Sequence, residues 1–399
     1  MSSKNKYLFP LIVMATLFFL LGFITTMNNS MIDFLKGAFD LNKVEKQLPN
    51  TFFYGAYILS VPIGFLINRI GYKNGVLSGL LMIVLGFFLC IPGVGMGYYG
   101  FLSAVSVFAI GVVLLQVAAN PYVNALGSPE TAASRLTLTN ALNSVATVIA
   151  PVFVSILIVT DTNDPKAVQV PFGIIGGITL VILVVMFFLK LPEIKGDEDV
   201  DESGQKKKYK SSAFKYPHMW LGSLAIFFYM GIEIGIPSFF ADYSDKIGFN
   251  FSDVERIDML KYYWGGLMVG RLIGIFVLQK YTARKILSLC AIGGVLLIAS
   301  SLAIGASAST VALWLFLGTG LFHSIMWPTI YNLALEDLGP HAKVASGVIA
   351  TSVIGAAILT PMMGAIHTAT NSVVIAISCL FIYYAYLVFF ATKGSRIRT

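Results

Sequence analysis

The chain has 399 residues, of which 57% are apolar and only 12% are charged, whereas soluble domains carry about 25% charged residues. This composition argues against a soluble enzyme, a nucleic-acid-binding protein and a disordered scaffold. The net charge of +7 fits a membrane protein, in which basic residues fix the orientation, as well as it fits an acidic partner. Cys90, Cys290 and Cys379 lie far apart in apolar segments, which indicates neither a disulfide framework nor a metal site.

Apolar stretches of about 20 residues, the length that an α-helix needs to cross a bilayer, recur along the whole chain. They predict an all-α membrane protein with twelve membrane-spanning helices. In chain order, the predicted spans are 8–32, 48–69, 74–93, 97–126, 136–160, 170–191, 217–241, 260–279, 285–305, 309–335, 343–367 and 371–392. The first is too long for the apolar part of a signal peptide and lacks a small-residue cleavage pattern, so we expect a permanent span.

The basic residues between these spans are distributed unevenly. If the N-terminus is cytoplasmic, nineteen Lys and Arg residues lie on the cytoplasmic side and seven on the other side, with Arg271 alone inside a span. The positive-inside rule therefore predicts that both termini are cytoplasmic, which agrees with an even number of spans. We expect a multi-pass protein of a plasma membrane, specifically a bacterial inner membrane, in contact with membrane lipid.

The segment between the sixth and seventh spans breaks the apolar pattern with an acidic block followed by the basic run Lys206–Lys208. We interpret 192–215 as a solvated cytoplasmic linker between an N-terminal six-helix bundle, 1–191, and a C-terminal six-helix bundle, 216–399. A shift of 210 residues pairs Tyr54-Gly55 with Trp264-Gly265 and Gly64 with Gly274. Parallel repeats of six helices are typical of major facilitator transporters, which bind substrate between the halves near the midplane.

The loop between the second and third spans reads Gly64-Phe65-Leu66-Ile67-Asn68-Arg69-Ile70-Gly71-Tyr72-Lys73. It resembles the G-x-x-x-D-R-x-G-R-[RK] loop of the major facilitator superfamily, although Asn68 stands where the motif has Asp. Glycines allow a tight turn and close helix approach, and basic residues face anionic headgroups and helix C-termini. We expect a cytoplasmic gating loop formed by Gly64, Asn68, Arg69, Gly71 and Lys73.

Two further segments resemble one particular family within this superfamily. They are Ala118-Ala119-Asn120-Pro121-Tyr122-Val123-Asn124-Ala125-Leu126-Gly127 and Arg135-Leu136-Thr137-Leu138-Thr139-Asn140-Ala141-Leu142-Asn143-Ser144. Both are similar to the fourth and fifth spans of the fucose:proton symporter family, whose members include fucose, glucose/galactose and N-acetylglucosamine permeases. The resemblance runs through essentially the whole chain and implies the major facilitator fold, with twelve transmembrane helices in two pseudo-symmetric six-helix bundles.

Ionisable groups at membrane depth cost free energy, so each one is a candidate for function. The resemblance implies that an Asp in the first span carries the coupled proton and that a Glu in the fourth span is a second titratable site. This chain has Asn29 and Gln116 at those places. Neither amide titrates. Asp33 lies one helical turn after Asn29 and can substitute for the missing acid or be an ordinary interfacial carboxylate.

The second half of the sequence offers three further ionisable groups inside predicted spans. Glu233 is our candidate for an ion-coupling group or a sugar-hydroxyl acceptor. Arg271 is the candidate for its structural ion-pair partner. His323 is either a coupling switch near neutral pH or a hydrogen-bonded histidine between helices.

The amide side chains in the predicted spans match the hydroxyl groups of a sugar, because an amide both donates and accepts hydrogen bonds. The resemblance implies sugar contacts at Asn140, where the family usually has Gln, and at Asn143. Trp264 and Trp327 are candidates for stacking on the C–H face of a sugar. The predicted substrate-binding set is Asn28, Asn29, Gln116, Asn120, Asn140, Asn143, Glu233, Trp264, His323 and Trp327.

These features predict a secondary transporter, not an enzyme, that imports a monosaccharide such as glucose, galactose or fucose by alternating access in symport with protons. The absence of a Walker sequence G-x-x-x-x-G-K-[ST] excludes ATP hydrolysis in this chain as the energy source. A sugar uniporter, a sodium-coupled symporter and a drug exporter of the same fold are the alternatives. We expect a monomer with no cofactor beyond the coupling ion, H⁺ or Na⁺, no metal site and no nucleic-acid partner.

Overall fold

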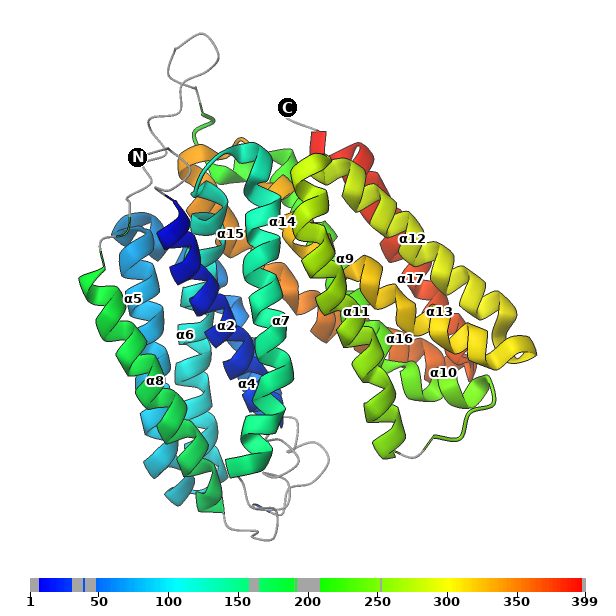
Figure 1. Cartoon of the computed structure of the whole chain (residues 1–399), viewed down its shortest axis with the longest axis horizontal. Helices are drawn as coiled ribbons and strands as arrows, with labels where there is room; N and C mark the ends of the chain where they lie inside the picture. The colour runs from blue at the N-terminus through cyan, green and yellow to red at the C-terminus, as the bar shows by residue number, and fades with distance from the viewer. Residues whose placement is uncertain are drawn as a thin grey trace. The chain divides into compact units, whose positions relative to one another are not determined.

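The computed structural model describes residues 7–30, 39, 48–157, 165–189, 191, 209–251 and 253–396, and every regular element among them is a helix (Figure 1). The helices of the first half of the sequence are α2 (Leu8–Ser30), α4 (Leu48–Gly55), α5 (Ser60–Gly95), α6 (Tyr98–Ala125), α7 (Ala132–Leu157) and α8 (Gln169–Phe188). Those of the second half are α9 (Pro217–Ser238), α10 (Phe240–Lys246), α11 (Asp253–Lys280), α12 (Ala283–Ile304), α13 (Ser309–His323), α14 (Met326–Leu335), α15 (Ala342–Thr351), α16 (Gly355–Thr370) and α17 (Val373–Thr392).

These helices follow the predicted membrane spans. Within the described residues, eight helical stretches are long and apolar enough to cross a membrane. Two of them, Thr51–Gly95 with 45 residues and Ala283–Leu335 with 53 residues, are each long enough for two crossings. The predicted fifth and eighth spans correspond to α7 and α11, which carry Asn140 and Asn143 and the charged Arg256 and Arg271. The predicted all-α fold is confirmed for this part of the chain.

Gly71 interrupts α5 between the predicted second and third spans. Its backbone has φ +83° and ψ 168°, outside the helical region. A positive φ is readily adopted by glycine because it has no Cβ. The turn that the loop motif predicts is therefore made at Gly71 itself.

Contacts between the helices divide the chain into two compact units. Unit 1 contains Met1–Gly127, Leu142–Lys208 and Gly339–Thr351, and unit 2 contains Ser128–Ala141, Tyr209–Leu338 and Ser352–Thr399. Each unit thus includes a short helical segment from the other half of the sequence. The predicted linker 192–215 lies mostly outside the described residues, and the predicted bundles 1–191 and 216–399 stay a prediction.

In unit 1, α5 packs against α6 with very close backbones, and α8 covers another side of α5. Glycine makes this approach possible. A Cβ atom at Gly79 would lie 2.8 Å from the backbone nitrogen of Leu115, and one at Gly111 would lie 2.6 Å from that of Ile83. Small residues at helix interfaces are a usual device of membrane proteins, where close van der Waals packing drives association.

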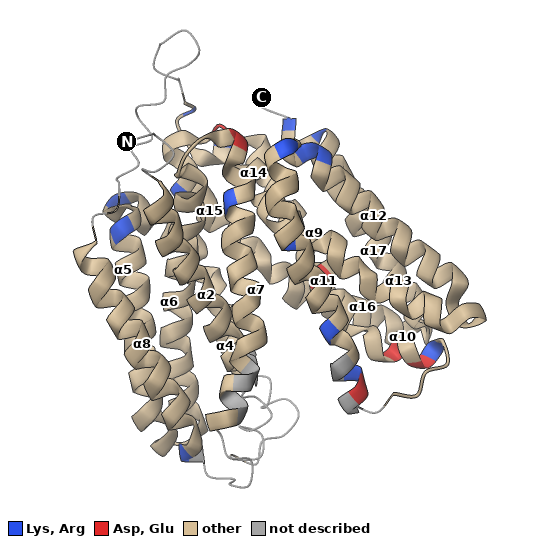
Figure 2. Cartoon of the chain, in the orientation of Figure 1, with Lys and Arg blue, Asp and Glu red and all other residues tan. Residues whose placement is uncertain are grey.

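In unit 2, α9 packs against α14, α16 and α17, while α13 packs against α11 and α12. The helices that carry Glu233, Arg271 and His323 therefore belong to one packed body. Figure 2 shows that most charged side chains lie near helix ends and that the middle parts of the helices are largely uncharged. This distribution is expected when the middle of each helix faces lipid or protein rather than water.

We expect Gly111→Ala to destabilise the protein, because the added Cβ meets backbone atoms of α5 that cannot move independently. The free energy of unfolding should fall by roughly 1 to 3 kcal/mol, the usual cost of overpacking. Thermal unfolding in detergent measures the effect. Gly177→Ala in α8 is the control, since a Cβ there has no atom within 4 Å. An equal melting temperature for both variants would contradict the packing account.

Candidate functional site

A group of polar side chains lies inside unit 2. Glu233 is on α9, Arg271 is on α11, and His323 is the last residue of α13. Nη2 of Arg271 lies 3.9 Å from Oε1 of Glu233, and the two side chains are 11% and 12% exposed. His323 is fully buried. The structure thus brings together the three ionisable candidates that the second half of the sequence offers.

A proline exposes the backbone carbonyl at Glu233. Proline has no N–H, so the carbonyl four residues before it in a helix lacks its usual hydrogen bond. Pro237 lies in α9, and the carbonyl that it leaves free belongs to Glu233. The hydroxyl of Tyr263 donates to this carbonyl at 3.0 Å. The bond fixes α11 against the turn of α9 that presents Glu233.

Pro328 has the same effect on Ser324, at the break between α13 and α14. Nε of Arg271 donates to the Ser324 carbonyl at 3.1 Å, and Nη1 donates to the Asn140 carbonyl at 3.3 Å. The side-chain amide of Asn140 itself donates to the carbonyl of Leu136 at 2.8 Å. Two backbone carbonyls therefore hold the guanidinium while its remaining nitrogen faces Glu233.

Three tyrosine hydroxyls surround His323. Nδ1 lies 2.9 Å from the Tyr263 oxygen, Nε2 is hydrogen-bonded to the Tyr384 hydroxyl, and Tyr229 donates to the His323 carbonyl at 3.0 Å. Tyr263 has a single hydroxyl hydrogen, which goes to the Glu233 carbonyl, so its oxygen accepts from the imidazole. The network therefore places a proton on Nδ1, and in a neutral imidazole Nε2 is then the acceptor for the Tyr384 hydroxyl. The full burial of His323 favours this neutral form, because a charge at membrane depth costs free energy.

Unit 1 holds a group of amides. Oε1 of Gln116 accepts from the Tyr57 hydroxyl at 2.9 Å, which leaves the NH₂ group of Gln116 available to other acceptors. Nδ2 of Asn143 donates to the Phe18 carbonyl at 3.0 Å. Asn143 approaches α2 at Gly22, where a Cβ would come within 2.8 Å of the Asn143 Cγ atom. These amides are held on helices that pack as one unit.

Two further amides of unit 1 are buried with an unused polar atom. Nδ2 of Asn28 and Oδ1 of Asn120 have no hydrogen-bond partner among the described residues. Pro121, next to Asn120, leaves the Val117 carbonyl free, and Ser346 donates to it at 3.1 Å. The proline and carbonyl arrangement of unit 2 thus recurs in unit 1.

The remaining predicted substrate-binding residues lie in varied settings. Trp264 is 42% exposed, next to the buried Tyr263. Trp327 is partly buried and stacks on Tyr331 with a centroid separation of 5.0 Å. Asn29 belongs to α2, but its side chain is outside the described part of the structure, and so is Asp33.

The predicted gating loop consists of Gly64, Asn68, Arg69, Gly71 and Lys73. Asn68 and Arg69 are exposed, and Lys73 donates to the carbonyl of Phe187 on α8 at 2.9 Å. Lys73 therefore ties the loop to the end of α8 within unit 1. Cations near a helix C-terminus are stabilised by the free carbonyls there.

The sequence did not point to the tyrosines Tyr229 and Tyr384. Tyrosine is common in this chain, with 18 copies, so a single tyrosine in an apolar span carries little signal. The available signal for Tyr263 is its place beside Trp264-Gly265. Across the described residues, no group of three or more His, Cys, Asp or Glu side chains could hold a metal ion.

We expect Tyr263→Phe to lower the free energy of unfolding by roughly 1 to 3 kcal/mol, because it leaves the Glu233 carbonyl and Nδ1 of His323 without partners. The neighbouring Tyr262→Phe is the control, since Tyr262 is exposed. In a Pro237→Ala background, the restored N–H can bond the same carbonyl, so Tyr263→Phe should cost less there. Thermal unfolding of the four variants measures this coupling, and an unchanged cost would contradict the role of Pro237.

Comparison with known proteins places the whole chain in one family. The sequence profile of the Major Facilitator Superfamily matches residues 14–361. A glucose/galactose transporter of Brucella abortus biovar 1 (strain 9-941) is 39% identical over 404 residues, which cover 99% of this chain and 96% of the relative. A putative glucose/galactose transporter of Helicobacter pylori (strain ATCC 700392 / 26695) is 37% identical, with coverage of 96% and 95%.

The fold is also similar to a solved structure. The crystal structure of a single-residue variant of the Escherichia coli fucose:proton symporter FucP superimposes with a TM-score of 0.86 at 25% identity, covering 98% of this chain and 100% of that chain. These relatives are transporters and not enzymes. On the profile match and on identities near 40% over its full length, the chain belongs to the Major Facilitator Superfamily and has its fold of twelve transmembrane helices.

Proposed function

We propose that this chain imports glucose or galactose by symport with protons. The relatives named for glucose and galactose are 39% and 37% identical to it, whereas the L-fucose-proton symporter of Escherichia coli is 28% identical in the same sequence comparison. This difference favours glucose or galactose over fucose. The proton coupling in the name of the fucose symporter favours H⁺ over Na⁺. The observation that carries the proposal is the buried pair of Glu233 and Arg271 in unit 2.

Glu233 is the proton carrier in this proposal because its surroundings suit both of its protonation states. When ionised, the carboxylate is neutralised by Arg271, 3.9 Å away. When protonated, it can donate to the oxygen of Tyr229, which lies one turn earlier on the same face of α9 and gives its own hydrogen to the His323 carbonyl. A proton can therefore be taken up or released without leaving a buried donor unpaired.

Arg271 makes the protonated state temporary. Its guanidinium stays bound to the carbonyls of Ser324 and Asn140 whether or not Glu233 is charged. When Glu233 is neutral, the positive charge of Arg271 is uncompensated at membrane depth, which costs free energy. That cost favours return of the proton once the sugar has left.

His323 acts as a positioning residue in this proposal and not as a second proton carrier. Both ring nitrogens already have tyrosine partners, and Nε2 accepts from Tyr384. A second proton on the ring would remove this acceptor and would place another positive charge near Arg271. The expectation that His323 takes part in coupling stays a prediction, and the geometry favours the neutral role.

The sugar contacts are assigned to the amides of unit 1. Asn28 and Asn120 each offer a buried polar atom without a protein partner, and Gln116 offers its NH₂ group. Hydroxyl groups of a hexose can satisfy such donors and acceptors. The sugar contacts expected of the rest of the predicted set stay predictions; these residues are Asn29, Asn140, Asn143, Glu233, Trp264, His323 and Trp327.

The protein is proposed to act as a monomer in a bacterial inner membrane, with both termini in the cytoplasm. The excess of nineteen basic residues over seven on the predicted cytoplasmic side supports this orientation. Reporter fusions at the two termini test it.

Uptake of labelled glucose and galactose into vesicles, with and without an imposed pH gradient, tests the proposed function. Wild-type protein should accumulate sugar above its external concentration only when the outside is more acidic. Glu233→Gln should abolish this accumulation, because glutamine cannot carry a proton, while exchange of labelled for unlabelled sugar continues. Glu255→Gln on the exposed start of α11 is the matched control and should accumulate sugar normally.

Three results would change the assignment. Equilibration without accumulation under any gradient would mean a uniporter, for which the amides Asn29 and Gln116 in place of the acids of relatives provide a reason. Accumulation driven by a sodium gradient would mean sodium symport. Undiminished accumulation by Glu233→Gln would show that Glu233 is not the coupling group.

A further inference from the structure

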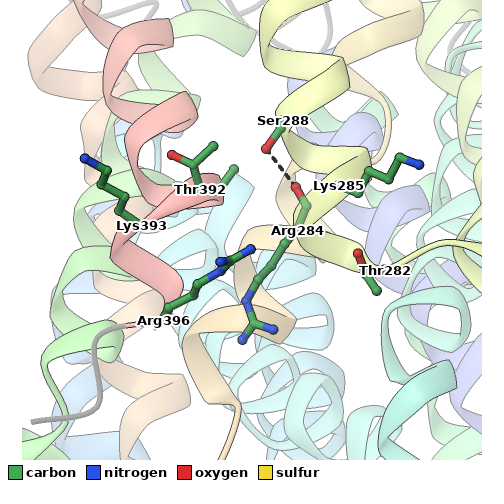
Figure 3. Close-up of a pocket in the computed structure, with 8 residues that line it drawn as sticks. Thr282, Arg284, Lys285, Ser288, Thr392, Lys393 and Arg396 are labelled. Carbon is green, nitrogen blue, oxygen red and sulfur yellow. Dashed lines mark hydrogen bonds between the residues drawn. The ribbon is translucent and has the colours of Figure 1, made fainter.

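A pocket of about 710 Å³ opens between the start of α12 and the end of α17 in unit 2 (Figure 3). Its lining residues are Thr282, Arg284, Lys285, Ser288, Ala391, Thr392, Lys393 and Arg396. Four of these eight residues are cations, three carry hydroxyl groups, and none is acidic. Figure 3 shows Arg284 and Arg396 extending from the two opposite sides into the space between the helices, while Lys285 and Lys393 point outward at its margins.

The placement of cations at the start of α12 is unfavourable without an anion. Arg284 and Lys285 lie in the first helical turn, which contains no acidic residue. The partial positive charge of a helix N-terminus favours acids there and disfavours bases. Arg284 is compensated by an ion pair with Glu336, whereas Lys285 lies over the ring of Tyr281 at 5.2 Å.

Lys393 and Arg396, which follow α17, add to the excess of positive charge in the pocket. Within the part of the chain that the structure describes, neither Lys393 nor Arg396 forms an ion pair or a side-chain hydrogen bond. Arg396 and Arg284 line the same pocket, and Figure 3 shows both side chains extending into it. Guanidinium groups that line one pocket repel each other, an anion in the pocket relieves that repulsion, and a phosphate group matches their planar N–H donors.

Apolar surface continues from the pocket along both helices. The exposed side chains on this surface are Leu289, Ile292 and Leu296 on α12 and Ile382 and Phe389 on α17. Residues three, four or seven positions apart lie on the same face of a helix. The three apolar residues of α12 therefore share a face with Lys285, and the two of α17 share a face with Lys393. A ligand that fills the pocket can therefore place a phosphate among the cations and acyl chains along the two helices. A free phosphate ion would make no use of the apolar surface.

We propose that this pocket binds the phosphate of an anionic phospholipid, such as phosphatidylglycerol, as a specific lipid site. Basic pockets between membrane helices are known to suit anionic headgroups. The central pair Arg284 and Arg396 contacts the phosphate, and the two lysines hold the remaining headgroup at the margin. The site is separate from the Glu233 group and does not depend on the sugar that is carried.

Native mass spectrometry of the full chain in detergent tests the proposal. The probes are phosphatidylglycerol, phosphatidylcholine with the same acyl chains, and glycerol 3-phosphate. We expect phosphatidylglycerol to bind more tightly than phosphatidylcholine, and glycerol 3-phosphate to bind far more weakly because it has no acyl chains. Lys393→Gln with Arg396→Gln should weaken phosphatidylglycerol binding roughly 25-fold, because each basic residue near the surface strengthens that attraction roughly fivefold.

The matched control is Lys215→Gln with Lys280→Gln, which removes two exposed cations of the same unit outside the pocket. It should leave phosphatidylglycerol binding unchanged. If the pocket variant does not fold, as judged by size-exclusion chromatography, Lys285→Gln replaces it with an expected loss of roughly fivefold. An equal loss in the control pair, equal binding of both lipids, or equal binding of glycerol 3-phosphate would overturn the proposal.

Discussion

A proline inside a membrane helix leaves one backbone carbonyl without a hydrogen bond, and the bilayer offers no water to replace it. The candidate site of unit 2 is built on this constraint. Pro237 leaves the Glu233 carbonyl free for Tyr263, and Pro328 leaves the Ser324 carbonyl free for Arg271. The positions of two prolines therefore decide where a tyrosine and an arginine bind, and those two side chains decide how Glu233 and His323 are presented. Helix bending is a second effect of the same residues.

The balance of charge between Glu233 and Arg271 determines which protonation states the site can adopt. At membrane depth a lone carboxylate or guanidinium is costly, so Glu233 and Arg271 are held close enough to neutralise each other but each retains other partners. The neutral histidine and its tyrosines add no charge and fix the geometry. The charges near the start of α12 and the end of α17 are not balanced within the protein, because four cations line the pocket and Arg284 alone pairs with a carboxylate, that of Glu336. The proposed phospholipid would supply the missing negative charge.

The sequence predicted the helices well because the length and hydropathy of a membrane span are set by the bilayer, which acts on each segment separately. It also predicted Glu233, Arg271 and His323, since a rare ionisable residue in an apolar span is conspicuous. It could not predict their partners. Tyr384 lies 61 positions from His323, and nothing local in an aromatic-rich chain marks it.

The sequence also could not predict the basic pocket. It presents the four cations only as signals of membrane orientation, because they meet in one pocket through the packing of α12 against α17; these are Arg284, Lys285, Lys393 and Arg396. Asp33 lies outside the described residues, so its expected role stays a prediction.

The central claim is that sugar and proton cross the membrane together and that Glu233 carries the proton. Its carboxyl group alternates between an ionised state, which is paired with Arg271, and a protonated state. Its most direct test is the pH of a weakly buffered suspension of protein-containing vesicles after glucose or galactose is added outside, with no imposed gradient. The account predicts that the outside becomes more alkaline as sugar enters, with wild-type protein but not with Glu233→Gln. Sugar entry with no change in external pH in the wild-type vesicles would contradict it.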